Sequence, residues 1–101
     1  MIGVFVSFRS EAGLDRSAVT AIAERAAPTF DGMPGLRSKA FTFDPESASA
    51  TNFYVWDSEE AARAFFSPEL VERVIELYGV APDVRFVEIA ALVDNGVATP
   101  A

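Results

Sequence analysis

The sequence predicts an α+β domain in which one antiparallel sheet carries helices on one face. Strand-like and helix-like patterns follow each other in the order β, α, β, β, α, β, with no internal repeat. Residues 36–56 also read as a two-stranded hairpin. This order is typical of a split βαβ sandwich whose third strand lies in the interior of the sheet. With 101 residues, half of them hydrophobic, we expect a single domain over residues 1–93 and a disordered tail over 94–101.

The first strand and helix are marked by their hydrophobic spacing. Residues 2–8 are a short run of Ile, Val and Phe with Gly3, hydrophobic on both alternating faces apart from Ser7, which predicts a central strand. Asp15 can cap a helix whose apolar residues recur at helical spacing. We expect this helix to end near Pro28, because proline interrupts the hydrogen bonding of a helix.

The hairpin carries the strongest candidates for chemistry. Its arms are residues 36–43 and 51–56, and the turn formers between them are residues 44–50. Since alternate residues of a strand share a face, Asn52, Tyr54 and Trp56 point one way and Phe53 and Val55 the other. One face of the returning arm is therefore apolar, and the other carries three groups that can form hydrogen bonds.

A helix in two pieces and a last strand complete the pattern. Asp57 or Ser58 caps the first piece and Ser67 the second, while Gly79 ends the second. Residues 84–93 are mostly apolar and predict the final strand.

Composition excludes several classes of function. The net charge is −7 and no basic patch occurs, so a nucleic-acid partner is disfavoured. The chain has no cysteine and no histidine, which removes disulfides, thiolate metal sites, a cysteine nucleophile and the commonest metal ligand and general base. The apolar start, residues 1–8, is too short for a membrane span or a signal peptide, so we expect a soluble cytoplasmic protein and no membrane partner.

The predicted sheet has no helix of its own for its second face. An apolar face of this kind is covered by a second copy or by a ligand, because small monomers rarely expose large apolar patches. We therefore expect a homodimer, and a small-molecule cavity between the sheet and the helices.

Several segments resemble a known family, namely residues 31–39, 52–58, 61–69 and 77–82. Over residues 2–93 the chain resembles short bacterial monooxygenases of the YdhR type, within the antibiotic-biosynthesis-monooxygenase superfamily. The resemblance implies a ferredoxin-like fold, a homodimer that forms a dimeric α+β barrel, and a ligand pocket in each subunit. In the cofactor-free oxygenases of this group an Asn and a Trp four residues later line the pocket, and Asn52 and Trp56 match that spacing. Haem-degrading relatives depend on a histidine ligand, which this sequence lacks.

The resemblance implies a cofactor-independent monooxygenase that acts with O₂ on an electron-rich aromatic substrate of the quinol or polycyclic phenol type. Side chains cannot readily reduce O₂, so the substrate anion would supply the electron and the protein would orient it and stabilise charge. No cofactor and no metal are expected. The candidate catalytic residues are Asn52, Trp56 and Tyr54, and the candidate substrate-binding residues are Tyr78, Phe65, Arg37 and Arg85.

Two other functions stay open. A non-catalytic small-molecule-binding dimer of the same fold would be stabilised by a small aromatic ligand without turning it over. An isomerase or cyclase that uses the same cavity would transform its ligand without oxygen.

Overall fold

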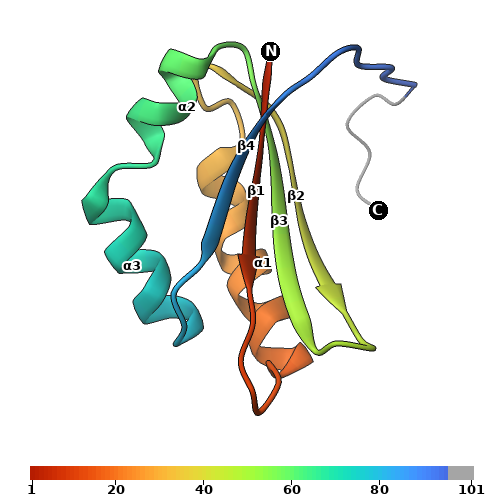
Figure 1. Cartoon of the computed structure of the whole chain (residues 1–101), viewed down its shortest axis with the longest axis vertical. Helices are drawn as coiled ribbons and strands as arrows, with labels where there is room; N and C mark the ends of the chain where they lie inside the picture. Colours follow the sequence, from red (N-terminus) through yellow and green to blue (C-terminus); the bar gives the residue numbers. More distant parts are fainter. Residues whose placement is uncertain (96–101) are drawn as a thin grey trace.

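The computed structural model describes residues 1–95, which form one four-stranded antiparallel sheet with three helices on one side (Figure 1). The elements are β1 Ile2–Phe8, α1 Arg16–Phe30, β2 Leu36–Asp44, β3 Ser49–Trp56, α2 Glu59–Phe65, α3 Pro68–Tyr78 and β4 Asp83–Glu88. The strand order is β2-β3-β1-β4, so β1 and β3 are the inner strands. The predicted α+β, ferredoxin-like architecture is confirmed, including the interior position of the third strand.

Alternation along β1 separates a covered face of the sheet from an uncovered one. Ile2, Val4, Val6 and Phe8 are buried and pack with residues of the helices. The opposite face, which we call the open face, carries Phe5 with 37% of its surface exposed. The core therefore lies between the sheet and the helix layer.

The predicted helix caps are present. The side chains of Asp15, Ser58 and Ser67 accept hydrogen bonds from backbone N–H groups three residues on, at 3.0, 3.1 and 3.2 Å. Gly79 ends α3 in the left-handed conformation, with φ 77°, which a residue with a Cβ adopts only with strain. These contacts fix where α1, α2 and α3 begin and where α3 turns back towards the sheet.

Helix α1 ends near Pro28 as predicted, two residues later at Phe30, because a proline in the last turn disrupts few of the helix's hydrogen bonds. Two other predicted boundaries are wrong. The hairpin loop comprises residues 45–48 only, since Asp44 and Ser49 already pair. Strand β4 ends at Glu88, not Val93: Glu88 pairs with Ile2, and one further hydrogen bond, from Ile89 N–H to the Met1 carbonyl at 3.3 Å, brings the pairing to the first residue of the chain. Of the predicted tail, residues 96–101 lie outside the described residues.

Candidate functional site

The hairpin brings a row of polar and aromatic side chains to the covered face. Asn52, Tyr54 and Trp56 are all buried there, at 4%, 4% and 2% exposure. Strand β2 places Phe41 opposite Asn52 and Lys39 opposite Tyr54. Alternation along both arms therefore assembles amide, phenol and amine groups on one surface beneath the helices.

A cleft of about 200 Å³ opens between α1 and α3 above this surface. We call it the α1–α3 cleft. Its polar lining residues are Thr29, Lys39, Asn52, Tyr54, Arg73 and Tyr78, and its apolar walls include Phe30, Phe41 and Phe65. A cavity with mostly apolar walls and a few convergent polar groups is the usual form of a small-molecule site.

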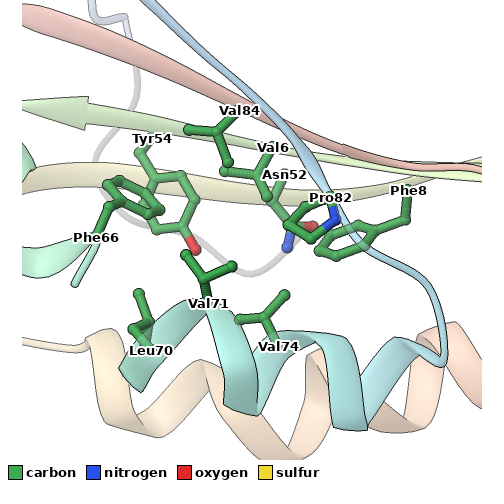
Figure 2. A pocket seen from close by; sticks show the side chains of 10 residues that line it. All are labelled: Val6, Phe8, Asn52, Tyr54, Phe66, Leu70, Val71, Val74, Pro82 and Val84. Atoms are coloured by element: carbon green, nitrogen blue, oxygen red, sulfur yellow. The ribbon is translucent and has the colours of Figure 1, made fainter. Parts of the chain in front are cut away.

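A second, smaller cavity lies deeper under α3 (Figure 2). It measures about 10 Å³ and shares Asn52 and Tyr54 with the α1–α3 cleft. In Figure 2 the Asn52 amide and the Tyr54 hydroxyl point from the sheet towards α3. This volume suits at most a water molecule, so a ligand would have to occupy the larger cleft.

Asn52 and Tyr78 form a hydrogen-bonded pair at the cleft wall. Asn52 Nδ2 donates to the Tyr78 hydroxyl oxygen at 3.3 Å. The Tyr78 ring stacks on Phe8 with 3.7 Å between centroids and 6° between planes, which fixes the ring. Because the hydroxyl oxygen accepts from Asn52, its own proton can be donated to a ligand.

Both tyrosines of the cleft are neutral donors near neutral pH. Burial raises the pKa of Tyr78, and the hydrogen bond from Asn52 opposes that rise. Burial also raises the pKa of Tyr54, and the neighbouring Tyr78 raises it further. Neither phenol can act as a base at physiological pH, so their contribution is hydrogen-bond donation.

Lys39 is the residue of this site that sequence reasoning missed. Its Nζ lies 3.5 Å from the ring centroid of Phe30, 4.1 Å from that of Phe41 and 4.3 Å from that of Tyr54. Burial lowers the pKa of Lys39 from 10.5 to about 7. Within the described chain no carboxylate lies within 4 Å of the amine. The signal was a lysine two residues before Phe41 on an otherwise aromatic strand face, but its neighbours depend on the hairpin register.

Replacing Lys39 with methionine is expected to stabilise the fold in a pH-dependent way. Below about pH 7 the lysine is charged in both states, so the folded chain bears the full cost of burying that charge. Between about pH 7 and 10.5 the folded state loses its proton first, and the stability of the wild-type chain rises with pH. The gain in melting temperature from Lys39→Met should therefore be larger at about pH 6 than at about pH 9. A Lys39→Met variant that melts below wild type at about pH 6 would mean that the ring contacts outweigh desolvation.

Trp56 is a core residue outside the α1–α3 cleft. Its ring lies 5.1 Å from that of Phe65 and 6.1 Å from that of Tyr54, centroid to centroid. The indole N–H is buried and has no hydrogen-bond partner among residues 1–95. Phe65 touches both places, since it lines the cleft and packs on Trp56. The expectation that Trp56 points into a hollow is not met.

The two arginines expected to bind substrate lie elsewhere. Arg37 sits at a bulge in β2, and its Nε lies 3.8 Å from an exposed Asp57 carboxylate oxygen. Arg85 is exposed on the open face, opposite Phe5 of β1. Strand alternation directs the Arg85 side chain away from the helices. Neither Arg37 nor Arg85 lines the cleft. Arg73 of α3 lines it instead.

Residues 1–95 contain neither a cluster of metal ligands nor a membrane-spanning helix. No group of three or more acidic, His or Cys side chains is placed to hold a metal ion there. None of the helices in this part of the chain has both the length and the apolar character that a bilayer crossing requires.

Comparison with known proteins shows the fold. No protein-family model matches the chain, and no curated protein matches its sequence. Among solved structures, one similar chain is a candidate antibiotic biosynthesis monooxygenase from Bordetella bronchiseptica, with a TM-score of 0.67 and 18% identity over 89% of this chain and 97% of that one.

Two further solved structures share the fold. A monooxygenase from the gene ActVA-Orf6 of Streptomyces coelicolor, in complex with Nanaomycin D, has a TM-score of 0.61 and 20% identity over 99% of this chain and 92% of that one. A variant of SnoaB, a cofactor-independent oxygenase from Streptomyces nogalater, has a TM-score of 0.64 and 14% identity over 90% of this chain and 94% of that one. At these identities the likeness establishes architecture, and activity has to be argued from the site.

Proposed function

We propose that this chain is a cofactor-independent monooxygenase of the YdhR type that oxidises an electron-rich aromatic substrate in the α1–α3 cleft. The observation that carries the proposal is that the Asn52–Tyr78 pair and Tyr54 line a cavity of about 200 Å³ that has aromatic walls. Two of the similar structures are named as a monooxygenase and a cofactor-independent oxygenase, which supports the same class. A chain without cysteine or histidine is also consistent with chemistry driven by the substrate's own electrons.

Anthrone, a polycyclic ketone whose enol is a phenol, is a suitable test substrate. Loss of a proton gives an electron-rich anion, which transfers one electron to O₂. The resulting radicals combine at the activated carbon, and protonation gives a hydroperoxide. Loss of water from the hydroperoxide leaves a second carbonyl, so that one oxygen atom enters the product and the other leaves as water.

The protein's part is to orient the substrate and to stabilise negative charge. Phe30, Phe41 and Phe65 supply ring faces and edges against a planar substrate. The Tyr78 hydroxyl donates a hydrogen bond to the substrate oxyanion. Asn52 polarises that hydroxyl through the hydrogen bond that it donates to the Tyr78 oxygen. The apolar side chains that α1 and α3 place around the cleft limit the contact of the anion with water.

The test is oxygen uptake by the purified, chelator-treated chain supplied with anthrone, corrected for the rate without protein. The proposal requires uptake matched by formation of the quinone. Thermal stabilisation by anthrone without uptake would favour the non-catalytic binding dimer, and conversion of a ligand under nitrogen would favour an isomerase or cyclase.

The open face is expected to hold a second copy of the chain. Phe5 and Phe53 pack there with 4.7 Å between ring centroids and 36° between ring planes, and none of the helices within residues 1–95 covers them. Sedimentation should give twice the chain mass of 10.9 kDa, and Phe53→Asp should halve that value, because a charge placed between Phe5 and Ala40 cannot be buried unpaired in an interface. The matched control is Leu77→Asp, an exposed residue of the helix layer, which should leave the mass unchanged. A monomeric wild-type chain would refute this assembly.

A further inference from the structure

We propose that the Lys39 amine is the general base that takes the proton from the phenolic hydroxyl of a substrate bound in the α1–α3 cleft. This assignment rests on the proposed function, and it supplies a proton acceptor to a cleft whose lining has no histidine and no carboxylate. It also narrows the substrate to an aromatic molecule with an ionisable hydroxyl group.

The position of the amine is set by three elements of the fold. Phe30 belongs to α1, Phe41 to β2 and Tyr54 to β3, and the Nζ atom lies within 4.3 Å of each ring centroid. Lys39 lines the same cleft as Asn52 and Tyr78. A base held by packing from three sides needs little reorganisation when it meets the substrate.

Burial favours the neutral form of the Lys39 amine, and the neighbouring rings offset part of the cost of the charged form. No carboxylate among residues 1–95 forms an ion pair with it, and burial lowers its pKa to about 7. A large fraction is therefore neutral, and able to accept a proton, at neutral pH. Once the ammonium forms, the three ring faces stabilise it through cation–π attraction.

The other ionisable groups that line the cleft do not take this role. Tyr54 and Tyr78 have raised pKa values and hold their protons, and the guanidinium of Arg73 has hydrogen-bond donors and no acceptor. On the other side, Asp31 and Arg37 line an adjoining surface hollow with Lys39. Among the groups that line the cleft itself, Lys39 alone can accept a proton near neutral pH.

The step is a simple proton transfer. The substrate O–H bond breaks with its electron pair left on oxygen, and a new N–H bond forms at Nζ. The products are a phenolate and an ammonium held side by side. The ammonium then acts as the counter-ion of the phenolate, while the Tyr78 hydroxyl can donate to the same oxygen.

The experiment titrates 2-naphthol bound to the full chain, because its naphtholate absorbs at a longer wavelength than the neutral molecule. In wild type the apparent pKa of the bound naphthol should fall by about 1–3 units below that of free naphthol, since the ammonium stabilises the anion. In Lys39→Met it should rise above the free value, because an apolar cleft disfavours an unpaired anion. The matched control is Arg73→Met, which removes the other cation of the cleft and should keep most of the wild-type lowering.

Binding of 2-methoxynaphthalene, which has no phenolic proton, separates this proposal from the proposed function. Wild type and Lys39→Met should bind it equally well, which shows an intact cleft. Equal binding together with the same naphthol pKa in both proteins would overturn the assignment of Lys39 and leave the cleft standing. A loss of the lowering in Arg73→Met as large as in Lys39→Met would also overturn it, because a diffuse positive field would then suffice. A wild-type chain that binds neither 2-naphthol nor 2-methoxynaphthalene would contradict the α1–α3 cleft as a binding site, and with it the proposed function and the assignment of Lys39.

Discussion

Replacing Asn52 with alanine is expected to lower the rate of anthrone oxidation by up to about 100-fold, the lower end of the range found when a direct donor to a developing oxyanion is removed, because Asn52 acts on the oxyanion through Tyr78. The physical reason is that Asn52 polarises the Tyr78 hydroxyl, which accepts its hydrogen bond at 3.3 Å. Without that amide, the hydroxyl is a weaker and less well-oriented donor to the substrate anion. The measurement is the initial rate of oxygen uptake at saturating anthrone.

Thr51→Val is the matched control for Asn52→Ala. Thr51 is the preceding residue of β3 and faces the opposite side of the sheet, where its hydroxyl lies 3.2 Å from that of Ser7. This variant should keep the wild-type rate, because its side chain does not reach the cleft. An Asn52→Ala protein with an unchanged melting temperature and an unchanged rate would remove Asn52 from the mechanism.

Truncation of Trp56 to alanine should cost about 3–5 kcal/mol of unfolding free energy, the usual range for a large aromatic in a core. Trp56 is only 2% exposed, and its ring contacts those of Tyr54, Phe65 and Phe66. Since small domains are stable by about 5–15 kcal/mol, this variant should be close to unfolding at room temperature. Urea titration followed by circular dichroism measures the loss, because the chain has no other tryptophan to report by fluorescence.

Trp56→Phe separates packing from chemistry. It keeps an aromatic ring in the core and removes an indole N–H that has no partner in the described chain, so it should cost much less than Trp56→Ala. The rate of anthrone oxidation by Trp56→Phe should stay near that of wild type. A Trp56→Phe protein of normal stability but without activity would return Trp56 to the list of catalytic groups.

Most of the fold could be predicted because its signals are local. The apolar run over residues 2–8 and the alternation along residues 51–56 predict the two inner strands, and Ser58 and Ser67 mark the starts of α2 and α3 by their side-chain hydrogen bonds. The end of β4 could not be predicted, because residues 89–93 are as apolar as a strand. Its pairing with β1 ends at Ile2 and its last hydrogen bond reaches Met1, and that limit depends on the register of two distant segments.

The candidate site was partly accessible for the same reason. Alternation places Asn52 and Tyr54 on one face, and the structure brings Tyr78 to them from α3. Lys39 was missed because its aromatic neighbours come from three elements, Phe30 among them. Arg85 was assigned to the site by charge alone, whereas its strand position sends it to the open face.

Labelling with ¹⁸O₂ tests the central claim most directly. Anthrone is oxidised by the metal-free wild-type chain and by Asn52→Ala in labelled oxygen, and the product is analysed by mass spectrometry. The account predicts that wild type inserts one labelled oxygen atom into the quinone at a rate well above the background, and that Asn52→Ala does not. A product without label, or equal labelling by both proteins and by buffer alone, would contradict an oxygenase site in the α1–α3 cleft.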